Sequence, residues 1–169
     1  ALLKILEEPN ENVYFILVHN NKKIQPTLIS RCINFKISLT NKDYLKISKK
    51  ILDNDLENLI SSDLISYYFT PGEVYYLVQF SLQNNYDLSK LNLKSFLKIL
   101  IEEGHYKKNN FIDNIMYNLI EFYFRKFNFY TDLVNEKYSY FIKRISDTKT
   151  YNLDKECLFM EFKEEILDG

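Results

Sequence analysis

The sequence predicts a mostly helical protein with a little β-structure near its start. Apolar residues recur with a helical period from about residue 40 onward, whereas two runs in the first 40 residues have strand character. Two strands do not form a stable sheet alone, and the chain begins at Ala1, within a helical pattern and without methionine. We therefore expect a piece of a longer protein, with the other strands of the sheet upstream.

The first 40 residues alternate between helix and strand patterns. Residues 1–8 form a helical pattern that stops at a proline, which lacks the N–H that a helix interior needs. Residues 13–18 are a continuous β-branched and aromatic run, typical of a strand buried on both faces. A short helix is predicted at 24–30, with a proline in its first turn, and 33–37 alternates with period two as a second strand.

Three helices are predicted between residues 40 and 83. Thr40 followed by Asp43 resembles a capping box at the start of the first helix. A second helical pattern covers residues 55–68. Thr70 and Pro71 are a strong start signal for the third, because they supply an N-cap hydroxyl and a proline at the first helical position.

The remainder is predicted to be helical throughout. The polar residues 83–85 are a candidate linker, and a helix after them ends at Gly104, which we expect to be a left-handed C-cap. A long helix follows over 111–130 and another over 133–145, and Asn152 is the expected cap of the last helix.

Composition excludes several classes of protein. With 22 basic and 23 acidic side chains the net charge is −1, so bulk charge gives no argument for a nucleic-acid partner. The chain has only 3 glycines, so it contains no Gly-rich loop that could bind a phosphate. This excludes a self-contained Rossmann or P-loop enzyme. The two cysteines are far apart, so neither zinc nor a disulfide framework is predicted. Short apolar runs and the lack of a signal peptide predict a soluble, cytoplasmic protein that contacts no membrane.

No catalytic constellation is recognisable, so the chain is not expected to be an enzyme by itself. His19 and His105 are the only histidines, and both are expected at the surface or in loops. Arg31, in the segment of residues 27–32, is the only arginine in the first 120 residues of a lysine-rich chain. A guanidinium binds phosphate in a bidentate way that lysine copies poorly. The alternative is a surface arginine paired with a carboxylate.

Three motifs resemble a known family. ALLKILEEP at residues 1–9, the strand at 13–18 and PTLISRC at 26–32 look like bacterial clamp-loader subunits, the AAA+ proteins of the DNA polymerase III holoenzyme. The resemblance is strongest over the first 37 residues. It implies that 1–39 is the C-terminal remnant of an AAA+ ATPase-like α/β domain, that 40–83 is a three-helix lid and that 84–169 is a helical collar for oligomerisation.

The resemblance also implies roles for single residues. Arg31 would be an arginine finger that reaches the γ-phosphate of an ATP, with its Mg²⁺, held by the neighbouring motor subunit, while this chain holds no cofactor or metal. Thr27, Ser30 and Cys32 complete the motif around it. His19 and Asn20 stand where motor subunits sense nucleotide with a small hydroxyl residue.

Two departures from the motor pattern favour a non-hydrolysing subunit. The third lid helix begins with Thr70, Pro71, Gly72 and Glu73, without the arginine that motor subunits carry there, and His19 and Asn20 replace the hydroxyl residue. The chain is therefore most similar to the delta-prime stator, with gamma/tau and delta subunits, the sliding clamp and primed DNA as partners within the complex. A gamma/tau motor subunit, or a helical interaction module unrelated to replication, are the alternatives.

Four lysines lie at helical spacing on the first lid helix: Lys42, Lys46, Lys49 and Lys50. Such a row could contact a phosphate backbone. The interleaved Asp43 and Asp53 favour a solvated helix face instead. Four aromatic residues of the collar are expected in the bundle core rather than in a base-stacking platform: Phe111, Tyr123, Phe127 and Phe141.

Overall fold

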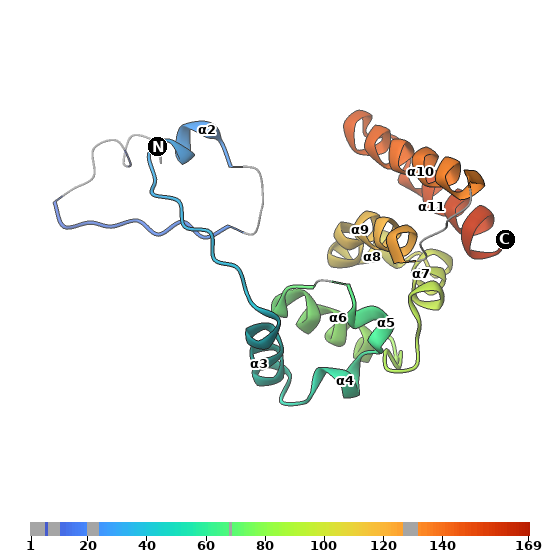
Figure 1. Cartoon of the computed structure of the whole chain (residues 1–169), viewed down its shortest axis with the longest axis horizontal. Helices are drawn as coiled ribbons and strands as arrows, with labels where there is room; N and C mark the ends of the chain where they lie inside the picture. The colour runs from blue at the N-terminus through green and yellow to red at the C-terminus, as the bar shows by residue number, and fades with distance from the viewer. Residues whose placement is uncertain (1–5, 7–10, 20–23, 68, 127–131) are drawn as a thin grey trace. The chain divides into compact units, whose positions relative to one another are not determined.

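The computed structural model describes residue 6 and residues 11–19, 24–67, 69–126 and 132–169. In the last of these ranges, side chains are described only from residue 136 onward. The chain divides into two compact units, Ala1–Leu39 and Thr40–Gly169. Each unit is described by itself. Figure 1 shows the order of the helices along the chain.

In the first unit, the predicted short helix is confirmed, whereas the two strands are not formed. Helix α2 spans Pro26–Ile29, with the proline in its first turn and Gln25 as the extended N-cap residue. Residues 13–18 and 33–37 are extended and unpaired, and among the described residues no strand is present. A strand forms only where a second strand takes up its backbone hydrogen bonds, and these described segments do not pair with each other. The sheet end of an AAA+ domain is therefore not seen here.

The second unit begins with helix α3, Asn41–Leu52, which packs against α6, Pro71–Gln83. The Thr40 hydroxyl accepts a hydrogen bond from the Asp43 N–H at 3.2 Å, so the predicted cap is confirmed. The predicted helix over 55–68 is wrong in its extent: it is two short helices, α4 at Leu56–Leu59 and α5 at Ser62–Ile65. Between them Ile60 is extended, because the Ser61 N–H donates to the Leu88 carbonyl instead of continuing a helix.

Helices α7 (Leu93–Glu102), α8 (His105–Lys108) and α9 (Asn110–Lys126) follow in close succession. Gly104 has φ 63°, so the predicted left-handed residue after α7 is confirmed. Helix α9 packs against both α7 and α8. The predicted continuation of its pattern to residue 130 lies outside the described residues.

Helix α10 spans Asp132–Tyr151, and α11 (Lys155–Phe162) continues directly into a π-helix, η1 (Lys163–Leu167). The predicted helix over 133–145 is confirmed and is longer than predicted. Asn152 is not the cap of the last helix: it has φ 50°, and the Asp154 side chain accepts the Glu156 N–H at 2.9 Å. Asx side chains suit both positions, so composition alone misplaced the cap by two residues.

One hydrophobic core joins the helices of the second unit, from Tyr44 on α3 to Leu167 on η1. Aromatic rings fill much of its C-terminal part, where Phe124, Phe141 and Phe162 lie with ring centroids 5.6–5.8 Å apart. Tyr123 and Phe141 are buried and Phe111 is partly buried, as the core interpretation expects, whereas Phe127 lies outside the described residues. Within the described part of the chain, no helix is long and apolar enough to span a bilayer.

Candidate functional site

Arg31 lies immediately after helix α2, in a turn that the helix itself sets. The Ser30 N–H donates to the Pro26 carbonyl at 3.0 Å, and the Arg31 N–H donates to the Leu28 carbonyl at 3.2 Å. Pro26 suits the first position of α2, because its fixed φ matches the first helical turn and an N–H is not needed there. The local sequence therefore places the arginine at a defined point at the end of a one-turn helix.

The structure brings Thr27, Ser30 and Arg31 together. The Arg31 Nη1 donates to the Thr27 carbonyl at 2.8 Å and approaches the Ser30 hydroxyl at 3.4 Å. The Ser30 hydroxyl itself donates to the Thr27 carbonyl at 3.2 Å. Arg31 is solvent-exposed, so these contacts orient a guanidinium that an anion can reach.

The other predicted residues of the site are less closely connected. Cys32 is half-buried, and its thiol is free. His19 is exposed in the extended segment of the first unit, and Asn20 lies outside the described residues. Their nucleotide-sensing role stays a prediction.

Glu73 has a structural role that the sequence analysis did not assign to it. Its carboxylate accepts the Thr70 N–H at 2.7 Å, while the Thr70 hydroxyl accepts the Glu73 N–H at 3.3 Å. This reciprocal capping box satisfies two N–H groups that the first turn of a helix leaves without partners. The spacing of Thr70 and Glu73 was visible in the sequence, and the capping box could have been found there.

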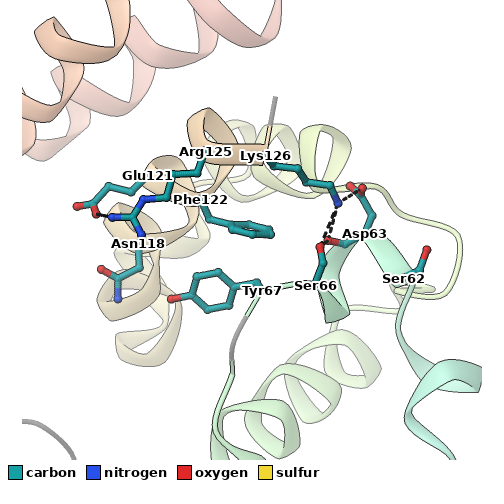
Figure 2. Close-up of a pocket in the computed structure, with 9 residues that line it drawn as sticks. All are labelled: Ser62, Asp63, Ser66, Tyr67, Asn118, Glu121, Phe122, Arg125 and Lys126. Carbon is teal, nitrogen blue, oxygen red and sulfur yellow. Dashed lines mark hydrogen bonds and ion pairs between the residues drawn. The ribbon is translucent and has the colours of Figure 1, made fainter. Parts of the chain in front are cut away.

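The second unit contains a pocket of ≈ 680 Å³ between α5 and α9. Figure 2 shows its charged side chains in two pairs, with Lys126 turned toward Asp63 and Arg125 turned toward Glu121. Lys126 forms an ion pair with Asp63 and lies 3.1 Å from the Ser66 hydroxyl. Arg125 and Glu121, on adjacent turns of α9, are paired at 3.8 Å.

Asp63 connects three helices at this pocket. Besides Lys126 of α9, its carboxylate accepts the N–H of Leu93, the first residue of α7, at 2.6 Å. Burial acts to raise the pKa of Asp63, but the hydrogen bonds from Lys126 and Leu93 outweigh it and hold the pKa below its ordinary value of 3.8. A carboxylate that stays ionised and bonded on both oxygens holds structure together and is poorly suited to proton transfer. Sequence reasoning missed this contact, because nothing in the pattern connects residues 63 apart.

His105 is buried, so the prediction of a surface or loop position is wrong. It is only 6% exposed, and its Nε2 lies 2.7 Å from the Tyr86 hydroxyl. Burial lowers the pKa of His105 below 6.5, with the Glu103 carboxylate 3.6 Å away opposing that shift. The Phe80 ring packs edge-on against the imidazole at 4.9 Å. Among the described residues, no group of His, Cys, Asp and Glu is arranged to hold a metal ion.

Known proteins match part of the chain. Residues 1–41 match the family described as DNA polymerase III, delta subunit. The DNA polymerase III subunit gamma of Buchnera aphidicola subsp. Schizaphis graminum is 44% identical over 54 residues, which are 31% of this chain and 15% of that protein. No solved structure matches.

Both matches support a DNA polymerase III clamp-loader family for this chain. They do not distinguish delta-prime from gamma, since one is described by a delta name and the other by a gamma name. The family match includes Thr27, Ser30, Arg31 and Cys32, whereas most of the second unit lies outside it.

Proposed function

We propose that this chain, in which the clamp-loader match covers residues 1–41, is part of a delta-prime-like stator subunit that supplies Arg31 to the ATP site of a neighbouring motor subunit. The observation that carries the proposal is an exposed arginine, oriented by Thr27 and Ser30, within the family-matched segment. Because Arg31 lies in the turn that follows α2, the backbone hydrogen bonds of that turn fix the position from which its long side chain starts.

An arginine in trans suits phosphoryl transfer for an electrostatic reason. Negative charge develops on the γ-phosphate in the transition state, and a fixed guanidinium neutralises it without reorganising water. Such fingers contribute about 10³ to 10⁵ in rate. The Mg²⁺ and ATP would belong to the neighbour, so this chain would act within the polymerase complex without catalysing a reaction by itself.

The stator assignment rests on the start of α6. That helix begins with Thr70 and Pro71 and carries Glu73 in its first turn. By the resemblance, motor subunits carry at the start of this helix an arginine that senses nucleotide. The first turn of α6 contains no lysine or arginine that could bind a triphosphate, and its Glu73 carboxylate is engaged in the capping box. The remaining partners follow from the proposal: gamma/tau and delta subunits directly, and the sliding clamp and primed DNA through the assembled cytoplasmic complex.

The test is the DNA-stimulated ATPase activity of the reconstituted loader containing the full-length protein. Arg31→Ala should leave the ring assembled but lower turnover at the neighbouring site by about 10³-fold or more. Arg31→Lys should recover little of the rate, because an ammonium lacks the planar fork of donors. Arg125→Ala is the matched control, since that arginine is 70% exposed and lies in the other unit. Unchanged turnover in Arg31→Ala would refute the finger.

A gamma/tau motor subunit is the second candidate, and the gamma name of the Buchnera relative favours it. The two differ in whether the full-length protein itself binds ATP. Calorimetry on the isolated full-length protein decides between them: no heat of ATP binding supports the stator, and saturable binding supports the motor. Failure to co-assemble with any clamp-loader subunit would leave a helical interaction module unrelated to replication.

A further inference from the structure

Helix α3 turns opposite faces to the core and to solvent. Tyr44 and Ser48 are buried and Leu52 packs against the core, so these positions, four residues apart, mark the inner face. Lys42, Lys46 and Lys50 have the same spacing but are displaced by two residues, which is about 200° around an α-helix. All three lysines are exposed, and they form what we call the lysine face.

The acidic residues nearby do not neutralise this face. The Asp43 carboxylate is engaged at the cap, where it accepts the Thr40 hydroxyl at 2.7 Å. Asp53, the C-cap residue of α3, forms no ion pair with any lysine of this face. Asp55 pairs with Lys49 at 2.7 Å, which removes that lysine from the row. Among the described residues, none of the three lysines of the lysine face forms an ion pair. The argument from interleaved acids for a merely solvated face is therefore weaker in the structure than in the sequence.

Helix stability accounts for only part of this arrangement. Lys50 lies in the last turn of α3, where the helix macrodipole favours a cation, but Lys42 lies in the first turn, where the macrodipole disfavours one. The stretch of helix axis from Lys42 to Lys50 is about 12 Å long, at a rise of about 1.5 Å per residue. Such a row of unpaired cations on one helix face suits a partner with regularly spaced negative charge.

We propose that the lysine face binds the phosphodiester backbone of double-stranded DNA directly. A protein partner fits less well, because protein interfaces are depleted in lysine and enriched in aromatic residues and arginine, none of which lies on this face. The duplex carries one negative charge per about 1.7 Å of its axis, so it can meet all three lysines at once. The contact goes beyond the proposed function, in which the chain reaches DNA only through the assembled complex.

The experiment measures binding of a short fluorescently labelled DNA duplex to the full chain by anisotropy, between about 50 and 200 mM salt. The triple variant Lys42→Gln, Lys46→Gln and Lys50→Gln should bind about tenfold more weakly than the unaltered chain. The magnitude of the slope of log affinity against log salt should fall by about 2–3. Circular dichroism confirms that the variant keeps its helices, which is expected for exposed positions.

The matched control removes the same charge from lysines held in ion pairs elsewhere in the second unit. Lys98 pairs with Asp168, Lys107 with Glu156 and Lys137 with Glu165. Replacing these three by glutamine should leave affinity and slope nearly unchanged. An equal loss in both variants would mean that only net charge matters, and would overturn the proposal. Unaltered binding in the first variant would also overturn it. So would tighter binding to a poly-glutamate peptide than to DNA. The assay contains no ATP, so its failure is distinguishable from a failure of the Arg31 test.

Discussion

The two compact units differ in how far their apolar side chains are exposed to solvent. In Thr40–Gly169, large side chains such as Phe96, Phe141 and Phe162 are fully buried in one core. In Ala1–Leu39, Tyr14, Ile16 and Val18 are 88–90% exposed, and the two residues between them are still 43–44% exposed. The same kinds of residue thus stabilise one unit and remain in contact with water in the other.

The alternating exposure shows what local sequence achieves without a partner. Successive side chains of an extended segment point to opposite sides, so the run over 13–18 already has the geometry of a strand. Ladder hydrogen bonds and a covering layer are both absent from the described residues. A contiguous apolar surface of this kind marks a place where another chain segment or protein packs. In the helices of the second unit the hydrogen bonds are internal, so only their apolar stripes need a neighbour.

The largest expected effect comes from removing a phenylalanine from the core of the second unit. Phe96 is 0% exposed, so Phe96→Ala should lower the free energy of unfolding by about 3–5 kcal/mol through lost burial and a cavity. Phe35→Ala is the matched variant in the first unit, where the side chain is 81% exposed, and should change stability by less than about 0.5 kcal/mol. Urea unfolding followed by circular dichroism measures both. Similar losses would mean that the first unit has a core of its own.

An intermediate effect is expected at Asp63, which holds α5, α7 and α9 together. Asp63→Ala leaves Lys126 and the Leu93 N–H without their shared acceptor, and should cost about 1–3 kcal/mol at neutral pH. Asp87→Ala is the control, because Asp87 also has a lysine partner and a backbone N–H donor but lies at the exposed surface. Its effect should be clearly smaller.

The pH dependence sharpens the same comparison. Because the pKa of Asp63 is depressed in the folded protein, its stabilisation is present above 3.8 and is lost as the pH falls through the folded-state pKa. The difference in unfolding free energy between wild type and Asp63→Asn should therefore shrink in acid. A constant difference from neutral pH to about pH 3 would show that shape, rather than charge, makes the contact.

Sequence reasoning succeeded where the determinant is local. The caps at Thr40 and Thr70, the proline at the start of α2 and the left-handed Gly104 each depend on residues within one turn. It failed where a distant group decides the outcome. The helix predicted over 55–68 breaks because the Ser61 N–H bonds to Leu88, a residue on a later segment.

The candidate site divides in the same way. Arg31 stood out because it is the only arginine in its part of the chain, and its contacts with Thr27 and Ser30 lie within four residues. His105 was misplaced because its burial depends on Tyr86 and Phe80, which precede it by 19 and 25 residues. Asp63 was missed for the same reason, since charge and spacing within α5 do not indicate Lys126.

The smallest expected effect separates two roles of Glu73. If its carboxylate acts as the capping box shows, Glu73→Ala should cost about 1 kcal/mol of unfolding free energy. Glu73→Gln should cost less, because a glutamine side-chain oxygen can still accept the Thr70 N–H. Both variants remove the negative charge, so calorimetry with ATP tests the other role: neither should gain nucleotide binding, since α6 still lacks a cation in its first turn. ATP affinity appearing in both variants would mean that the charge itself excludes nucleotide, and the cap would then be a secondary reason for an acid at this position.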